Sequence, residues 1–412
     1  MTIAEGVSVR VAYKAYSGGT MTSNAEADTA TDPGAASAQI LRRVASTLDL
    51  TKDTYESAEI RADRQVADFR HGVRRVAGSI QGELSPASYF PLIEASNRDT
   101  ATSSVTLTEA GLTSCTATGS TFVFGGGDPV ALGLRVGDVI RFTNLSEALN
   151  NSRNFTILSF GGTTNRTVTV TPAPTAMASD SAFSLSRPGA TTKVPLTGHV
   201  RRLFAFEHYS EDLDIARLFT ECRVHGYRMS LPATGMATIE IPVMGRNMQV
   251  LTGGSAPYFT SPTAAGTTGI AAAVNGIIRA SGSAVGVVTG IDLNAEIAGS
   301  APAVVGQNFV PDIILGRYRL SGQVTALFES STLLEAFLNE TEVDLLVRLD
   351  ASSDANSEAI SIHLPRVKFG AANIPAQGEG EQVVTLPFTA LLYDGSTAGV
   401  EVTTCRIHDT AA

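Results

Sequence analysis

One stretch of this sequence occurs twice, and the repeat limits the fold more than any other feature. The segment GVRRVAGSIQGELSPASYFPLI, residues 72–93, returns as GRYRLSGQVTALFESSTLLEAFL, residues 316–338, at a constant offset of 244 residues. At this offset Gly78 aligns with Gly322. Internal repeats fix an architecture, and two copies are too few for a solenoid. We therefore expect a duplicated domain.

Each copy predicts one half-buried strand followed by a short helix. Apolar and polar residues alternate along residues 318–328, and the earlier copy repeats this alternation. Period-two alternation is typical of a strand with one face in a core and the other in water. In the earlier copy the helix must start at Pro91 or be kinked there, because proline breaks a helix interior. The expected polar positions are Arg75, Ser79, Gln81 and Glu83 in the first copy, and Arg319, Ser321, Gln323 and Thr325 in the second.

A second pair of segments supports the duplication. TECRVHGYRMSLP followed by ATIEIPVMG, within residues 220–245, resembles TEVDLLVRLD followed by AISIHLPRVKFG, within residues 341–370. In this alignment Pro242 corresponds to Pro365. Proline cannot donate to a ladder, so each proline predicts a strand end, a bulge or an edge.

The first copy is interrupted by a segment of different character. Short Thr/Val-rich runs, separated by Gly, Asn and Pro and without a helical pattern, predict a small β-barrel or sandwich. The expected order is an N-terminal arm (1–38), a discontinuous first repeat domain (39–100 and 191–250), an inserted β-domain (101–190), a joint or loop (251–286) and a second repeat domain (287–412).

Composition and charge narrow the class of protein. Hydrophobic residues make up 43% of the 412 residues, charged residues 17%, and there is no Trp, a profile typical of β-rich extracellular or viral structural proteins. The net charge of −10 argues against a grip on nucleic-acid phosphates, which needs clustered Lys and Arg. The most basic run, RADRQVADFRHGVRR, also contains Asp63 and Asp68, which we expect to pair with its arginines.

No pattern of reactive residues predicts chemistry. The sequence has no CxxC, HxxxH, HExxH or GxSxG motif, and GGGD at residues 125–128 lacks the GK[ST] of a phosphate loop. Glu379 and Glu381 lie in a GEGE turn, where solvation explains them. We expect no catalytic, cofactor-binding or metal site, and no enzyme. The residues considered are Cys115, Cys222 and Cys405, and His71, His199, His208, His225, His363 and His408.

The N-terminus lacks the pattern of a signal peptide, and no stretch reaches the 18 or so apolar residues of a membrane helix. We therefore expect a soluble chain with no membrane partner.

Three stretches resemble a known family. LRRVASTLDLTKDTYESAEIRADRQVADFRHGVRRVAGSIQGELS resembles the opening of the tail tube proteins of long-tailed, siphovirus-like bacteriophages. CRVHGYRMSLP is similar to the middle of these proteins, and IHLPRVKFG with GEQVVTLPFTALLYDG to their end. The resemblance covers residues 39–96 and 195–407 and is most specific at 55–84 and 359–394. The inserted GLRVGDVIRFTNLSEALNNSRNFTIL is similar to modules that decorate some members.

This resemblance implies a mainly β fold, with two tail-tube β-sandwich or split-barrel domains, short flanking helices and the small inserted all-β domain. It implies a virion protein, made in the host cytoplasm, whose rings stack into a non-contractile tail tube. The bore would house the tape measure protein and conduct genomic DNA without specific binding, and the tube would meet tail terminator and tip proteins. If simple members form six-membered rings, a duplicated chain should form a homotrimer with pseudo-sixfold symmetry, and otherwise a hexamer.

A second class of function fits the same residues. A monomeric β-rich adhesion protein could use the inserted domain to bind carbohydrate or protein. The polar arm and the duplicated amphipathic strands favour the tube, because a monomer should have fewer segments that become ordered only against a neighbouring subunit. An acidic bore would let DNA pass without sticking, which agrees with the net charge.

Overall fold

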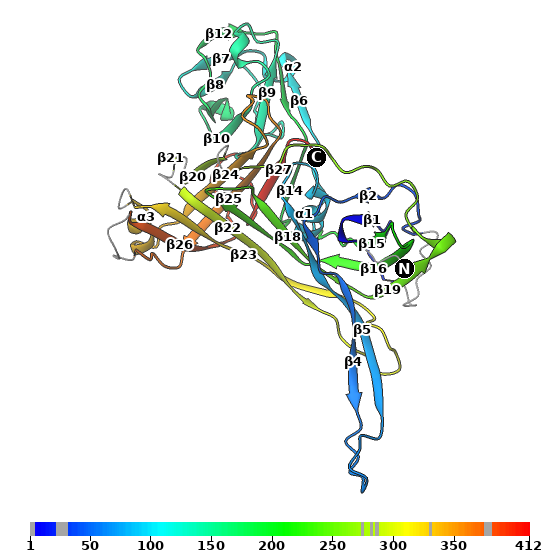
Figure 1. Ribbon diagram of the computed structural model, residues 1–412. Helices are drawn as coiled ribbons and strands as arrows, with labels where there is room; N and C mark the ends of the chain where they lie inside the picture. Colours follow the sequence, from blue (N-terminus) through cyan, green and yellow to red (C-terminus); the bar gives the residue numbers. More distant parts are fainter. Residues whose placement is uncertain are drawn as a thin grey trace.

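The protein is mainly β, with 49% strand and 7% helix in antiparallel sheets, which confirms the expected fold class. Figure 1 shows a central body, a separate module above it and a long hairpin below it. No helix in the described part of the chain combines the length and apolar character needed to cross a membrane. The computed structural model describes residues 5–21, 32–272, 276–280, 283–284, 288–328, 332–374 and 381–412. Part of the expected arm (22–31) and Glu379 lie outside these ranges.

One long sheet runs through both copies of the repeat. We call it the long sheet. Its strands lie side by side in the order β3/β4, β5, β18, β17, β22, β23 and β26. Their bounds are β3 Ala45–Ser46, β4 Asp49–Glu56, β5 Phe69–Glu83, β17 Gly226–Pro232, β18 Thr238–Gly245, β22 Val288–Ser300, β23 Ile314–Leu327 and β26 Val383–Ala390.

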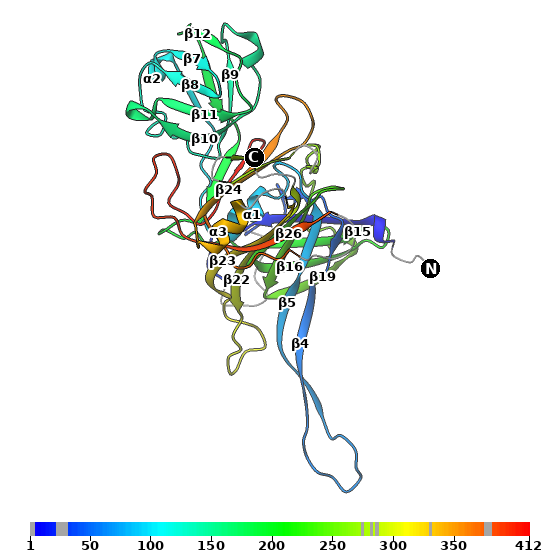
Figure 2. The ribbon, with the colours of Figure 1, turned by 90° about the vertical axis from the view of Figure 1, so that its left-hand side faces the viewer.

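A second layer of strands and two helices covers one face of the long sheet, and the main core lies between the layers. Figure 2, turned by 90° from Figure 1, shows the hairpin of β4 and β5 extending away from the body. The first copy contributes β1 Val9–Ala15, β2 Gln39–Ile40, α1 Phe90–Asn97, β15 Phe204–Ser210, β16 Ile215–Val224 and β19 Asn247–Thr252. The second contributes β20 Gly276–Ala280, β21 Ser283–Ala284, α3 Thr332–Leu338, β24 Val343–Asp350, β25 Ala359–Phe369 and β27 Arg406–Asp409. Helix α1 starts beside Pro91, as expected.

The strand register of the first copy recurs in the second. Ser79 faces Pro242 in the β5–β18 ladder, and Gln323 faces Pro387 in the β23–β26 ladder. Gln323 follows Ser79 at the offset of the repeat, so the two ladders correspond residue by residue. The counterpart of Pro242 is therefore Pro387, and its predicted alignment with Pro365 was wrong.

The outer strands correspond in the same way. The β15–β16 ladder has a bulge between Phe204 and Phe206, and the β24–β25 ladder has one at the matching place, between Val343 and Leu345. Strands β24 and β25 are thus counterparts of β15 and β16, whereas the sequence alignment had matched them to β16 through β18. That alignment failed because similar Thr-Glu and Pro residues occur in strands with different positions in the fold.

Both copies carry glycine at the positions of Gly78 and Gly322 for the same steric reason. A Cβ on Gly78 would meet the carbonyl oxygen of Thr47 at 2.5 Å, and a Cβ on Gly322 would meet that of Asp292, inside normal contact. Thr47 and Asp292 occupy the same position in their copies. Only glycine lets the neighbouring strand approach this closely.

The first strand of each copy lies where the sequence suggested an arm and a joint. Strand β1 pairs with β15, with Val11 facing His208, and β20 pairs with β24, with Ile278 facing Val347. These are matching positions in the two copies. We therefore propose that the copies begin at β1 and β20 and not at residues 39 and 287.

The inserted strands form an eight-stranded sheet with its own apolar core. Phe122 packs against Phe142 and Phe155, with ring centroids 4.5 and 5.1 Å apart. The elements are β6 Val105–Thr108, α2 Glu109–Leu112, β7 Cys115–Thr118, β8 Thr121–Phe124, β9 Val139–Thr143, β10 Phe155–Gly161, β11 Thr167–Thr171, β12 Met177–Asp180 and β13 Ser184–Arg187. We call residues 105–187 the inserted module.

The module follows α1 of the first copy in sequence but is mounted on the second copy. Asn154 Nδ2 donates to the Ser357 carbonyl at 2.7 Å, and Arg348 Nη1 donates to Thr156 Oγ1 at 3.0 Å. The strand that leaves the module, β14 (Ala190–Lys193), pairs with β27. The module is therefore tied to the outer layer of the second copy.

A buried ion cluster strengthens this mounting. The Asp138 carboxylate, fully buried in the module, forms an ion pair with Arg406 of β27 and lies 3.7 Å from Arg187 Nη1. Burial opposes its charge, but Arg406, His408 and Arg187 outweigh burial and hold the pKa of Asp138 below its ordinary value. The module is thus held to β27 by charge as well as by backbone pairing.

Candidate functional site

The water-facing side of the long sheet is a polar surface to which both copies contribute. Along β18, Ile239, Ile241 and Val243 point into the core, whereas Thr238 and Glu240 point to the other side. The same alternation runs through every strand from β5 to β26 and follows from the two-residue period of a strand. We call this surface the polar face. It carries Arg75, Ser79, Gln81, Glu83, Arg228, Ser230, Thr238, Glu240, Asp292, Asn294, Glu296, Arg319, Ser321, Gln323, Thr325, Thr385 and Thr389.

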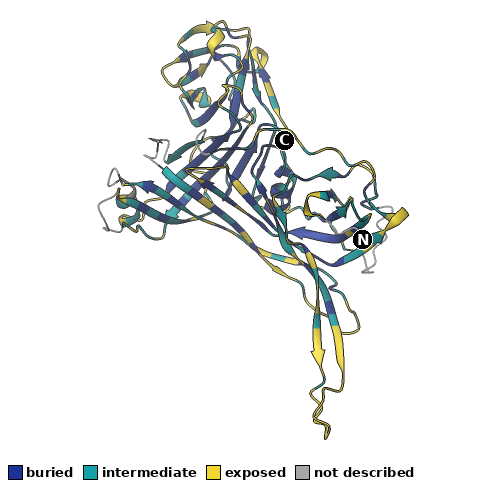
Figure 3. Cartoon of the chain, in the orientation of Figure 1, coloured by how far each residue is buried: buried dark blue, intermediate teal, exposed yellow. Residues whose placement is uncertain are grey.

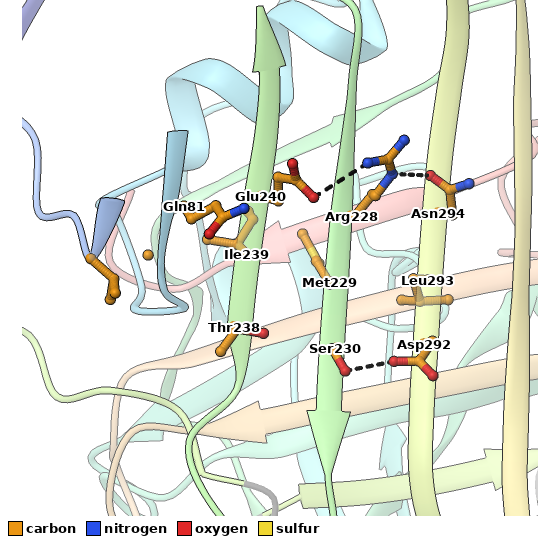
Figure 4. Close-up of a pocket in the computed structure, with 12 residues that line it drawn as sticks. Gln81, Arg228, Met229, Ser230, Thr238, Ile239, Glu240, Asp292, Leu293 and Asn294 are labelled. Carbon is orange, nitrogen blue, oxygen red and sulfur yellow. Dashed lines mark hydrogen bonds and ion pairs between the residues drawn. The ribbon is translucent and has the colours of Figure 1, made fainter. Parts of the chain in front are cut away.

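The two copies join in the middle of this face, where β17 pairs with β22. Figure 4 shows this seam, with polar side chains linked across the strands. Arg228 Nε donates to Asn294 Oδ1 at 3.2 Å, and its Nη1 donates to Glu240 Oε2 at 3.3 Å. Ser230 Oγ donates to Asp292 Oδ1 at 2.6 Å. The seam is therefore crossed by a row of paired polar groups.

The arginines of this face stand beside carboxylates. Arg75 Nη1 lies 3.1 Å from Asp53 Oδ1, and Arg319 faces Glu296 directly across the β22–β23 ladder. Hydrogen bonds from Ser79 and Arg228 hold the pKa of Glu240 below its ordinary value despite partial burial. Further carboxylates on or beside this face belong to Asp49, Glu83 and Asp292. The face is thus acidic on balance: Arg75 and Arg228 are ion-paired, and Arg319 stands opposite a carboxylate.

The face is hollowed over the seam. A depression of about 540 Å³ lies above β5, β18, β17 and β22, and a neighbouring one of about 460 Å³ shares Asp292 and Asn294 with it. Their lining combines neutral polar groups with paired charges. In the described residues no group of three or more His, Cys, Asp or Glu side chains could hold a metal. Such a surface can make many weak polar contacts with a passing polymer.

The three cysteines and His408 are buried side chains. Burial raises the pKa values of the Cys115 and Cys405 thiols to about 12. His408 accepts from the Val139 N–H at 3.0 Å through Nδ1 and lies 2.7 Å from the Pro188 carbonyl through Nε2. Burial lowers the pKa of His408 to about 4, so it is neutral at pH 7. These contacts are those of packed core residues.

The basic run lies on the β4–β5 hairpin, whose outer end is exposed in Figure 3. Arg61 pairs with Asp63 at 3.0 Å, and Arg70 pairs with Asp68 at 2.7 Å. The predicted pairing of the two aspartates with arginines is thus confirmed. This pairing removes much of the positive charge that a phosphate backbone would need.

Sequence reasoning found half of the polar face. The alternation predicted the polar positions of β5 and β23, and the structure confirms them. It missed Asp292, Asn294 and Glu296 of β22, although the apolar residues of this strand alternate with them in the sequence. It also missed Arg228 and Glu240, because the pairing of β17 with β22 is a long-range contact that no local pattern announces.

Comparison with known proteins agrees with this architecture. A search of curated proteins found no match. The family model described as phage tail tube protein matches residues 6–390, which is most of the chain and includes every strand from β1 to β26. The chain therefore belongs to the phage tail tube protein family and is a structural protein of the virion tail, where it assembles into the tube and contacts other tail proteins.

Proposed function

We propose that this chain forms rings in which the polar face lines the bore, and that the rings stack into the tube through which DNA leaves the virion. The observation that carries this proposal is the long sheet. It passes from the first copy to the second without a break and keeps one polar face throughout. At one side it ends at β3 and β4, and at the other side at residues 371–374, which lie against β26; no strand in the described residues pairs with the outer side of either edge. Joining such edges between chains closes a barrel and removes the edges.

The charge of the polar face suits a conduit for DNA. DNA is a polyanion, and a bore with excess carboxylates repels its phosphates, while neutral Ser, Thr, Asn and Gln side chains offer only weak contacts. The arginines of the face already have carboxylate neighbours. DNA should therefore pass without being held, and the tape measure protein should occupy the same bore before ejection.

The outer layer determines what the outside of the tube presents. The inserted module is tied to β24, to the loop between β24 and β25, and to β27, which lie on the opposite side of the core from the polar face. In a ring it would project outward as one protrusion per chain. We propose a homotrimer with pseudo-sixfold symmetry, a non-contractile tail, contacts with terminator and tip proteins at the tube ends, and synthesis in the bacterial host cytoplasm.

Electron microscopy of the purified protein at rising concentration tests this function. We expect rings and tubes with a continuous central bore. A compact monomer that forms neither rings nor tubes, and that binds carbohydrate through the inserted module, would overturn the proposal in favour of an adhesion protein.

A further inference from the structure

The long sheet ends in two edges, and the seam inside the chain indicates how they meet. At one end, β3 and β4 pair with β5 on one side, and no strand in the described part of the chain pairs with their other side. At the other end, residues 371–374 follow β25 and lie beside β26. Each edge corresponds to a strand of the other copy, and these two strands, β17 and β22, pair with each other at the seam.

Residues 371–374 are the counterpart of the start of β17. Asn373 and Thr385 exchange both backbone hydrogen bonds, each 3.0 Å long. Strand β26 corresponds to β18 at an offset of 145 residues, so Thr385 corresponds to Glu240 and Asn373 to Arg228. The Asn373–Thr385 bridge therefore matches the pair of Arg228 and Glu240 in the β17–β18 ladder. Since Asn373 uses its backbone groups on β26, those of Ala372 and Ile374 point toward the open edge.

Strands β3 and β4 are the counterpart of β22. Asp49 faces Ala77 of β5, and Asn294 faces Ser321 of β23 at the matching position. The two ladders even share a bulge, between Lys52 and Thr54 in the first copy and between Ile297 and Gly299 in the second. The outer edge of Leu48–Thr51 therefore corresponds to the edge of β22 that pairs with β17.

We propose that residues 371–374 of one chain pair with Leu48–Thr51 of the next chain in the register of the internal seam. Tyr227 faces Ala295 and Arg228 faces Asn294 inside the chain. The corresponding pairs between chains place Ala372 opposite Leu50, Asn373 opposite Asp49 and Ile374 opposite Leu48. This inference rests on the proposed function, because it requires rings, but it adds which edges meet and in which register.

The side chains fit this register. Ala372 and Ile374 pack toward the core of their copy, as Leu50 does in its own, so apolar groups would meet apolar groups on the core side. On the polar face, the Asn373 amide would donate to the Asp49 carboxylate. In the single chain, Asp49 Oδ1 accepts from the Leu50 N–H at 2.8 Å, and the neighbour's backbone would replace this local bond.

Disulfide trapping tests the register directly. Inside the chain, the Ile297 N–H donates to the His225 carbonyl at 2.9 Å, which makes Arg228 and Asn294 a non-hydrogen-bonded pair of the same ladder. The Cα atoms of such pairs lie about 4.5 Å apart, at the short end of the range for a disulfide. Asp49→Cys with Asn373→Cys would form the matching pair between chains. The native cysteines are buried and should not compete.

Control variants show whether a disulfide reports the proposed register or only the proximity of two assembled chains. Arg228→Cys with Asn294→Cys should give a disulfide within one chain and shows that the geometry can be trapped. Thr51→Cys with Asn373→Cys moves the pair two residues out of register on the same face. A mixture of chains carrying only Asp49→Cys with chains carrying only Asn373→Cys should give covalent dimers and no larger species.

In assembled tubes, we expect the Asp49→Cys/Asn373→Cys chain to crosslink into covalent rings, about tenfold more than the off-register pair, because a disulfide tolerates little displacement. Equal or greater trapping of the off-register pair, or tubes that form without any crosslink, would overturn the register and leave the tube function standing. Particles that never form rings in the microscope would overturn both proposals.

Discussion

Asp138→Asn removes one negative charge from the buried cluster that mounts the inserted module on β27. The side chain keeps its shape, but Arg406 and Arg187 lose the carboxylate that balances them. Breaking a buried ion pair by neutralising one partner costs about 3–5 kcal/mol, because the other charge stays buried. Arg187 keeps hydrogen bonds to the Gly133 and Ser103 carbonyls at 3.0 and 2.6 Å. We therefore expect a loss near the low end, about 3 kcal/mol.

Urea unfolding followed by circular dichroism measures this loss, and hydrogen exchange locates it. Amides of β9, β14 and β27 should exchange faster in the variant, whereas those of β5 and β18 should not change. Asp63→Asn, which breaks an exposed pair on the hairpin with both side chains 44% exposed, is the matched control and should leave stability unchanged. An Asp138→Asn protein with wild-type stability and wild-type exchange at β27 would refute the reasoning.

Three further predictions follow from single sites. Gly322→Ala should destabilise the fold by about 1–3 kcal/mol, since the added Cβ meets a backbone carbonyl, whereas Gly254→Ala, which meets nothing within 4 Å, should be neutral in the same urea titration. The pKa of His408 is about 4 in the folded protein, below the roughly 6.5 of an unfolded chain, so the stability that goes with its neutral form is fully present above pH 6.5 and falls by up to about 3 kcal/mol as the pH drops to about 4. His408→Gln should make the free energy of unfolding depend less on pH over this window. An unchanged pH dependence in the variant would contradict this role of His408. Asp292→Lys adds positive charge to the polar face and should make tubes retain DNA at low salt, whereas Glu109→Lys on the inserted module should not; equal retention by both variants would argue against a bore lined by the polar face.

Local pattern predicted those parts of the fold that depend on neighbours in sequence. The two-residue alternation identified β5 and β23 and their water-facing residues, because a strand with one buried face must alternate. Pro91 located the start of α1. Thr/Val-rich runs separated by turn residues predicted the strands of the inserted module.

The parts that could not be predicted depend on long-range pairing. Strands β1 and β20 pair with β15 and β24, which lie far along the chain, so the polar segments that flank β1 and β20 were interpreted as an arm and a joint. Pro365 matched Pro242 by residue type, but only the ladders showed that Pro387 is the true counterpart. The seam of β17 and β22 connects residues more than fifty positions apart, and half of the polar face is visible only once they are paired.

Averaged end-on images of assembled tubes test the central claim most directly, namely that each chain supplies two equivalent units to one ring. The duplicated register predicts three outer protrusions, one inserted module per chain, around a bore of nearly sixfold symmetry. Six protrusions around the ring would contradict this use of the repeat, because each chain would then count as a single unit.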